Sequence, residues 1–292
     1  MRSLLITGAS GLLGGNLSFI ALEEWDVHGT YLSNRPSMNG PTWHRMDLRD
    51  ADSVNSVFSK VCPETVVHTA AIADIDECEA KPEEAWQVNC LGTKRVVEAC
   101  GDFGAKLVHI STSNVFDGEK GDYIESDPRR PINAYSRSKI AAEDEALGLS
   151  DSIVARTALV LGFNRTGGRS FLARAVEKLS TGSLGLPGDE IRSPIDVKTL
   201  CSGLLELIDL DERGVFHIAG VEYLTRFRIG LKIAEKLDAE RSRVEILRRI
   251  PDDRAPRPRD ASLNTRKARS VLSLRLPNCD EALRRALDFR DG

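Results

Sequence analysis

A glycine motif near the N-terminus constrains the fold of this chain more than any other feature. The stretch TGASGLLGG places Gly8, Gly11 and Gly14 directly after a short apolar run and at the start of an apolar helical run. Glycine at these positions lets the chain turn tightly and lets a pyrophosphate approach the backbone N–H groups at the helix N-terminus. A glycine triplet is a weak signal by itself, but one that joins a strand to a helix predicts dinucleotide binding.

The rest of the N-terminal half follows the pattern that such a motif requires. Short apolar runs alternate with longer amphipathic runs, which is typical of a parallel sheet covered by helices. The sequence therefore predicts an α/β fold with a doubly wound parallel sheet of the Rossmann type. The expected strands are residues 3–7, 26–31, 42–46 (weak), 65–71, 106–112, 152–158 and 214–220, and the clearest helices are residues 82–100 and 133–148.

The alternation weakens after Thr157, where the chain becomes rich in loops. A chain of 292 residues with 41% hydrophobic content is long for one domain and short for two independent ones. We therefore expect a dinucleotide-binding Rossmann domain over residues 1–157, to which residues 197–218 return. Residues 158–196 and 219–292 would form a smaller C-terminal substrate-binding lobe.

Composition excludes several classes of protein. A formal net charge of −4 gives no global basic excess of the kind that nucleic-acid binding needs. The first apolar run is too short for a signal peptide, and no stretch approaches the ~20 apolar residues of a membrane span, so we expect a cytoplasmic protein without a membrane partner. The scattered cysteines favour neither a disulfide framework nor a zinc site. We interpret all six as reduced packing residues: Cys62, Cys78, Cys90, Cys100, Cys201 and Cys279.

The G-x-x-G-x-x-G spacing resembles that of the short-chain dehydrogenase/reductases. The resemblance implies a catalytic tyrosine with a lysine four residues later, and the segment AYSRSK supplies Tyr135 and Lys139. One helical turn puts both side chains on the same face. A free phenol has a pKa of about 10, so a nearby ammonium and the cationic nicotinamide are needed to make it a useful acid or base near neutrality. Such a pair often occurs by chance on an exposed helix, but its position after the fifth expected strand favours catalysis.

A narrower resemblance follows from the segments ISTSNVFDG, PINAYSRSK and RPRDASLNTRKA. They are similar to the dTDP-4-dehydrorhamnose reductase branch of the extended short-chain dehydrogenases, whose members typically show S-T-D-x-V-F-D-G, P-x-N-x-Y-G-x-x-K and R-P-x-x-S-x-L. The similarity runs from Ser3 to about Leu287. It extends to the regulatory β subunit of methionine adenosyltransferase, which shares the fold but works as a partner protein.

The resemblance implies that the catalytic hydroxyl is Thr112, three residues before Val115, where it would hydrogen-bond the substrate carbonyl beside Tyr135. Strand alternation would put Ser111 and Ser113 together on the other side. Ser113 stands where relatives carry an aspartate that touches the sugar, so the identity of the sugar stays open.

The remaining implied site residues fall into two groups. The cofactor would contact the glycine turn, the ends of the strands and the catalytic pair: Gly8, Ser10, Gly11, Leu12, Leu13, Gly14, Ser33, Asn34, Arg35, Asp47, Leu48, Ala70, Ala71, Tyr135 and Lys139. The substrate would contact Ser113, Asn114, Asn164, Arg257 and Arg259. Asn89 is either the asparagine that the family keeps near the active site or an ordinary polar helix residue.

The end of the second expected strand predicts the cofactor. Folds specific for NAD place an acidic residue there, about 20 residues past the glycine motif, to hold the ribose hydroxyls. This chain reads GTYLSNRP without a carboxylate. We therefore predict a preference for NADPH, with Arg35 on the 2′-phosphate and Ser33 assisting; the alternative is that Arg35 points to solvent and NADH is accepted as well.

Three further features bear on possible ligands. The stretch from Arg241 to Arg269 contains ten basic and four acidic residues, which indicates either a solvated surface or recognition of an anion. His68 and His109 lie in apolar strands and are expected to be core residues. The magnesium-linked dimer contact of some relatives uses a glutamate where this chain has Asn16, so we expect no metal, and a homodimer stays open.

The resemblance implies a reductase of a nucleotide-linked 4-keto-6-deoxy sugar, foremost dTDP-4-dehydro-L-rhamnose. Hydride would pass from the nicotinamide to C4 while Tyr135 protonates the alkoxide, Lys139 binds the ribose and lowers the phenol pKa, and Thr112 positions the carbonyl. The alternatives are a regulatory subunit that only binds the dinucleotide, and an epimerase or reductase acting on another sugar nucleotide. A dehydratase needs an acid/base pair beside the hydroxyl, and TSN at residues 112–114 offers no carboxylate.

Overall fold

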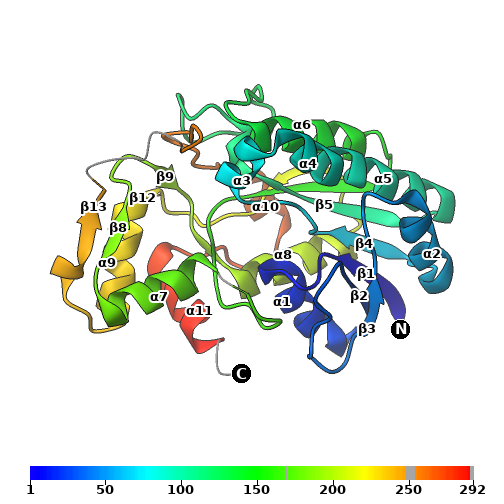
Figure 1. The fold of residues 1–292 in the computed structure, drawn as a ribbon, viewed down its shortest axis with the longest axis horizontal. Coiled ribbons are helices and arrows are strands. Elements are labelled where there is room, and N and C mark those ends of the chain that lie inside the picture. The colour runs from blue at the N-terminus through cyan, green and yellow to red at the C-terminus, as the bar shows by residue number, and fades with distance from the viewer. Residues whose placement is uncertain (169, 248–253, 290–292) are drawn as a thin grey trace.

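Seven parallel strands form the central sheet of the computed structural model, which describes residues 1–168, 170–247 and 254–289 (Figure 1). The strand order is β11-β6-β5-β4-β1-β2-β3. From β1 the chain adds β2 and β3 on one side of the sheet, and then crosses over to add β4, β5, β6 and β11 on the other side. This is the doubly wound order, so the predicted fold class is confirmed. The strands are β1 (Arg2–Thr7), β2 (Trp25–Tyr31), β3 (Thr42–Arg45), β4 (Thr65–His68), β5 (Lys106–Thr112), β6 (Ser152–Thr157) and β11 (Gly214–His217).

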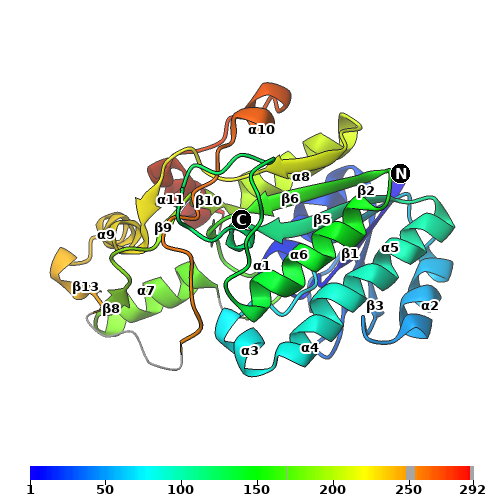
Figure 2. The same cartoon turned by 90° about the horizontal axis from the view of Figure 1, so that it is seen from above.

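Helices cover both faces of this sheet (Figure 2). One face packs against α1 (Leu12–Ile20) and α8 (Val197–Asp209), and the other against α2 (Ala51–Val61), α5 (Gly92–Phe103) and α6 (Ala134–Leu147). Because both faces are covered, β4 and β6 are buried along their whole length, and the apolar residues at their centres follow one another without alternation.

The helix expected over residues 82–100 forms, but it contains a π-helical turn and extends to Phe103. The chain forms α3 (Ile75–Ala80) and then α4 (Pro82–Trp86), a π-helical turn at Gln87–Leu91 and finally α5. The turn contains Asn89, whose side chain accepts a 2.8 Å hydrogen bond from the backbone N–H of Ile72 and donates a 3.0 Å bond to its carbonyl. A π-helical turn interrupts the regular hydrogen bonding of a helix, and such turns often occur at functional sites.

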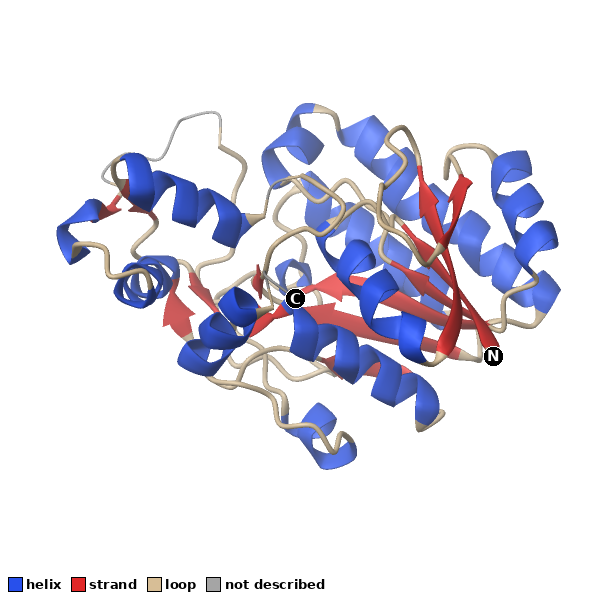
Figure 3. Cartoon of the chain, turned by 90° about the horizontal axis from the view of Figure 1, so that it is seen from below, coloured by secondary structure: helices blue, strands red, loops and turns tan. Residues whose placement is uncertain are grey.

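Segments from the C-terminal half build a second lobe beside the carboxyl ends of the strands (Figure 3). It has its own apolar core, to which Leu172, Leu186, Ile229 and Leu283 contribute. The lobe contains more regular structure than its loop-rich sequence suggests. Its elements and the short strands and helix that border it are β7 (Val160–Leu161), α7 (Phe171–Thr181), β8 (Leu184–Leu186), β9 (Ile191–Arg192), β10 (Ile195–Asp196), β12 (Leu224–Thr225), α9 (Arg226–Lys236), β13 (Val244–Ile246), α10 (Arg266–Val271) and α11 (Cys279–Asp288).

The chain returns to the Rossmann sheet between two passages through the second lobe. Helix α8 packs against α1, and β11 pairs in parallel with β6 through Val215 and Phe216. Among the described residues, no helix combines the length and the apolar character that crossing a bilayer requires.

Candidate active site

The glycine turn brings the ends of β1 and β4 into contact. Gly8 has a φ of +65°, and a Cβ atom there would lie 2.6 Å from the Cα of Ala70. A Cβ at Gly14 would lie 2.7 Å from the Thr69 hydroxyl, and the N–H of Gly11 donates a 2.9 Å bond to the carbonyl of Gly8. A side chain at Gly8 or Gly14 would separate the strands or fill the space above the turn, so glycine is required at both positions.

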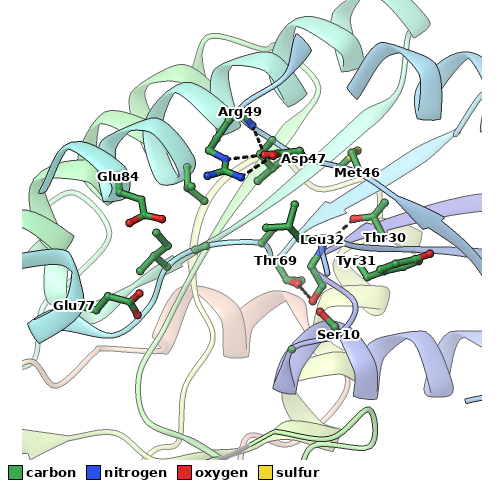
Figure 4. Close-up of a pocket in the computed structure, with 17 residues that line it drawn as sticks. Ser10, Thr30, Tyr31, Leu32, Met46, Asp47, Arg49, Thr69, Glu77 and Glu84 are labelled. Carbon is green, nitrogen blue, oxygen red and sulfur yellow. Dashed lines mark hydrogen bonds and ion pairs between the residues drawn. The ribbon is translucent and has the colours of Figure 1, made fainter. Parts of the chain in front are cut away.

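A cavity of about 350 Å³ opens directly above this turn (Figure 4). Its wall includes seven of the residues expected to bind the cofactor: Gly8, Ser10, Gly11, Asp47, Leu48, Ala70 and Ala71. The other expected residues lie elsewhere. Leu12 and Leu13 pack against the core, and Ser33, Asn34 and Arg35 are exposed on the segment that follows β2.

Sequence reasoning missed part of the cavity wall. Leu32, Arg49 and Glu84 line it, together with Thr30, Tyr31, Met46, Thr69, Ile72, Glu77 and Val88. Asp47 and Arg49 form a two-pronged ion pair, in which Arg49 donates 2.9 and 2.7 Å bonds to the two carboxylate oxygens. These bonds hold the pKa of the Asp47 carboxyl below its usual value. The glycines of the turn leave room for phosphates to approach the backbone, and the apolar side chains and the fixed Asp47 carboxylate line the rest of the wall. This arrangement fits a dinucleotide.

Tyr135, in the first turn of α6, lies near Thr112 at the end of β5, close enough for the Thr112 side chain to lower the pKa of the phenol. Both residues are buried. Burial is the larger effect and raises the pKa of Tyr135 to about 12. The structure therefore brings together two residues that the sequence separates by a loop and a helix start, and the phenol holds its proton near neutral pH.

Lys139 lies one helical turn beyond Tyr135 and faces the sheet. Its Nζ atom donates a 2.8 Å bond to the carbonyl of Ile110 and lies 3.2 Å from Nε2 of His109. Burial lowers the pKa of Lys139 to about 8, against the opposing charge of Glu143. His68 and His109 are fully buried, and burial lowers the pKa of both. The contact of His109 with Lys139 carries no signal in the sequence.

The three consecutive hydroxyls have three different environments. Ser111 donates a 2.5 Å bond to Glu143, while Thr112 accepts bonds from the backbone and side-chain nitrogens of Asn114. A 3₁₀ turn begins at Ser113, so strand alternation ends before that residue, and the expectation that Ser111 and Ser113 form a pair on one side of the strand is wrong. Ser113 and Asn114 instead line a second cavity.

This second cavity, of about 220 Å³, lies between the two lobes. Arg192, Arg226 and Arg257 line it, together with two carboxylates, Glu190 and Asp74. Burial lowers the pKa of Arg192 to about 10 and lowers that of Arg226 as well. Arg257 was expected at the substrate, but its guanidinium grips Asp76 through bonds of 2.6 and 2.7 Å. The cavity therefore has three guanidinium groups, of which Arg257 is paired with Asp76, against two carboxylates in its wall, and this excess of positive charge suits an anion.

The other expected substrate residues lie at different places. Asn164 donates a 3.3 Å bond to the carbonyl of Ser10 and so borders the glycine turn, away from the second cavity. Arg259 is exposed, and its backbone carbonyl accepts a 2.6 Å bond from Ile191. Arg248 and Arg249 of the basic stretch lie outside the described residues. Asn16 donates bonds to the carbonyls of Leu12 and Phe163.

Asn89 has the role of a structural link within this site. Besides its two bonds to Ile72, its amide donates a 3.0 Å bond to the hydroxyl of Ser138 on α6. It thereby joins the segment that follows β4, at the first cavity, to the helix that carries Tyr135. Asn89 is fully buried, so its amide serves contacts within the fold and does not lie on the helix surface.

Comparison with protein families matches residues 1–290 to the family described as the RmlD substrate binding domain. A probable low-salt glycan biosynthesis reductase of Haloferax volcanii is 30% identical over 287 residues, 95% of each chain. A dTDP-4-dehydrorhamnose reductase of Mycobacterium tuberculosis is 31% identical over 264 residues, 87% of this chain and 81% of the relative. The methionine adenosyltransferase 2 subunit beta of Rattus norvegicus is 27% identical over 278 residues, 92% and 82% of the two chains.

Solved structures share the whole fold. The crystal structure of a hypothetical dTDP-4-dehydrorhamnose reductase from Sulfolobus tokodaii is 35% identical with a TM-score of 0.86, covering 95% of this chain and 97% of that chain. A dTDP-4-dehydrorhamnose reductase from Bacillus anthracis, in complex with NADP, is 25% identical with a TM-score of 0.83 and covers 99% and 100%.

Proposed function

The chain belongs to the RmlD substrate binding domain family, whose named relatives include sugar-nucleotide reductases, and from this membership we propose that it reduces the C4 ketone of a nucleotide-linked 4-keto-6-deoxy sugar. The foremost substrate is dTDP-4-dehydro-L-rhamnose, which would give dTDP-L-rhamnose. The observation that carries the proposal is the buried group of Thr112, Tyr135 and Lys139, placed next to a cavity with three arginines. Such a group can donate a proton to a carbonyl oxygen, and the arginines suit the diphosphate of a sugar nucleotide.

The chain's own residues would supply the proton and the orientation. The nicotinamide cofactor, when bound above the glycine turn, supplies the hydride that reduces C4. The Thr112 hydroxyl would hold the substrate carbonyl next to Tyr135, and the Tyr135 phenol would give its proton to the alkoxide as the C–H bond forms. The phenolate that is left would be stabilised by the ammonium of Lys139, which Ile110 and His109 hold in place.

We propose NADPH as the preferred cofactor. The relative from Bacillus anthracis was crystallised with NADP. In this chain no carboxylate follows β2 between Tyr31 and Arg35, so a 2′-phosphate would meet no repulsion there. Arg35 is exposed on this segment and free to reach a phosphate at the mouth of the first cavity. NADH would bind more weakly.

The second cavity would hold the diphosphate. Arg192 and Arg226 line it from the second lobe, and Ser113 and Asn114 line it from the end of β5. A ligand with two phosphates could contact both guanidinium groups while its sugar points towards Thr112, because Ser113 follows Thr112 directly. Charge-assisted bonds from arginine are stronger than neutral ones, and a planar guanidinium can bind two phosphate oxygens at once.

A regulatory subunit is the second candidate, and the similarity to the methionine adenosyltransferase 2 subunit beta is the observation that favours it. Two measurements distinguish a reductase from a regulatory subunit: NADPH oxidation at 340 nm with dTDP-4-dehydro-L-rhamnose, and NADPH binding followed by fluorescence. Turnover of the sugar nucleotide supports the reductase. Tight NADPH binding without turnover of dTDP- or UDP-linked 4-keto sugars would favour the regulatory role.

A further inference from the structure

Glu143 is a fully buried carboxylate that the proposed reaction does not use. It lies on α6, two helical turns beyond Tyr135 and one beyond Lys139, on the same face of the helix. Its side chain accepts bonds of 2.9 and 2.8 Å from Arg156, one of 3.2 Å from Arg129 and one of 2.5 Å from the Ser111 hydroxyl. Arg156 is buried as well, in β6.

Such a cluster contributes little net stability to the fold compared with apolar side chains in its place. Burying a carboxylate and a guanidinium removes both from water, and well-packed apolar side chains of the same volume often give equal or higher stability. What the cluster does provide is geometry, because Glu143 has two oxygens and four bonds that must all be made at once. It joins α6 to β5 through Ser111 and to β6 through Arg156.

The bond to Ser111 lies next to the catalytic contact. Ser111 directly precedes Thr112, and Thr112 is the last residue of β5 before the chain turns away from the sheet. On the helix, Glu143 and Tyr135 belong to one rigid element. The Ser111–Glu143 bond therefore sets how far the end of β5 lies along α6, which in turn sets whether the Thr112 hydroxyl meets the Tyr135 phenol.

We propose that Glu143 is a positioning residue that acts through Ser111 and holds the Thr112 hydroxyl against Tyr135. This inference rests on the proposed reductase function for its kinetic effect, but not for its structural effect. The groups that surround Lys139 are also relevant to the pH dependence: Tyr135 and Glu143 on α6, His109 on β5, and behind them His68 on β4 and Arg156 on β6. Of these, only Glu143 brings a negative charge that raises the pKa of Lys139.

The first test is Ser111→Ala, which removes the link and leaves both arginines paired with Glu143. We expect kcat to fall about tenfold, with the Kd for NADPH unchanged, because a small misplacement of catalytic groups lowers the rate without loss of binding. Backbone amides of residues 112–116 should exchange with deuterium faster. The control is Ser18→Ala, which removes another buried serine hydroxyl, one that donates a 2.8 Å bond to the Gly14 carbonyl. It should change neither kcat nor the exchange of residues 112–116.

The second test is Glu143→Gln, alone and combined with Ser111→Ala. If Ser111 acts through Glu143, the double variant loses no more kcat than Glu143→Gln does. Loss of the negative charge should also move the alkaline limb of kcat to lower pH, whereas Ser111→Ala should leave that limb in place. Glu206→Gln, which alters a half-buried carboxylate bonded to the backbone of Ser273 and Leu274, controls for the loss of a structural charge.

The results separate this inference from the proposed function. Wild-type kcat together with wild-type exchange at residues 112–116 in Ser111→Ala would overturn the positioning role, and so would additive losses in the double variant. If the wild-type protein does not turn over sugar nucleotides, the reductase proposal fails, and faster exchange in Ser111→Ala but not in Ser18→Ala still supports the link.

Discussion

The ammonium of Lys139 donates a 2.8 Å hydrogen bond to the backbone carbonyl of Ile110, two residues before Thr112. This bond anchors α6 to β5 at the level where the proposed catalytic groups meet. Because its acceptor is a main-chain atom, the position of Lys139 depends on the fold and on no particular side chain at residue 110. The same helix carries Tyr135 and the strand carries Thr112, so their pairing follows from the packing of α6 on the sheet.

The first prediction concerns proton donation. Tyr135→Phe keeps the ring and removes the hydroxyl, so kcat should fall by roughly 10²–10⁴ while the Kd for NADPH stays near that of the wild type. Thr112→Val should also lower kcat strongly, and more than Ser111→Ala does. Steady-state kinetics and NADPH fluorescence measure both quantities, and a larger loss in Ser111→Ala than in Thr112→Val would show that Thr112 is not the catalytic hydroxyl.

The glycine turn can be tested with a pair of matched glycines. Gly8 and Gly104 have nearly the same φ, +65° and +66°, but a Cβ would meet Ala70 at 2.6 Å in the first and nothing within 4 Å in the second. Gly104→Ala should therefore cost only the backbone strain of about 1–2 kcal/mol. Gly8→Ala should cost more and abolish NADPH binding. Chemical denaturation and NADPH fluorescence check this, and equal behaviour of the two variants would contradict it.

Cofactor choice can be assigned to one arginine. Arg35→Ala should weaken NADPH by about ten- to a hundredfold and leave NADH nearly unchanged, since charge-assisted bonds contribute roughly 1.5–3 kcal/mol. Arg49→Ala should weaken both cofactors, because it leaves Asp47 in the wall of the first cavity without its ion pair. Binding titrations with the two cofactors provide the measurement. Equal losses in Arg35→Ala would show that this residue acts through the fold.

The role of Arg257 depends on which anion it serves. If it contacts the diphosphate, Arg257→Ala should raise KM for the sugar nucleotide more than it changes kcat. Asp76→Asn is the matched variant, because it breaks the 2.6 Å ion pair but keeps the guanidinium in the second cavity. We expect KM to stay near the wild-type value in Asp76→Asn. The same rise in both variants would mean that the ion pair itself, and not a ligand contact, is what matters.

Buried histidines predict how stability responds to acid. Burial lowers the pKa of His68 and of His217 to about 3, so both stay neutral in the folded protein at mildly acidic pH. The unfolded chain takes up these protons near pH 6.5 and therefore binds more protons than the folded one. Stability should then decline as pH falls below about 6.5.

A variant isolates one of these protons. In His68→Asn the free energy of unfolding, measured with denaturant between about pH 4 and 6, should depend on pH less steeply than in the wild type, by about 1.4 kcal/mol per pH unit. An unchanged slope would show that His68 is protonated in the folded state.

The sequence by itself determined the features that depend on neighbouring residues. The strand–turn–helix unit around Gly8 follows from local steric demands, and the placement of Tyr135 and Lys139 on one helix face follows from their spacing. Alternation of apolar runs likewise specified the doubly wound sheet, because covered parallel strands must be apolar on both faces. Each of these rests on contacts within a few residues or on a repeated pattern.

Only the tertiary structure decided which distant residues meet. Arg49, and not Arg35, lines the first cavity; Arg192 and Arg226 complete the second; and Glu143 holds Ser111 beside the catalytic hydroxyl. The π-helical turn at Gln87–Leu91 was not predicted either, and its Asn89 bonds to Ile72, which follows β4. Contacts between residues far apart in the sequence depend on how the strands and helices pack, and the spacing of residues along the chain does not specify that packing.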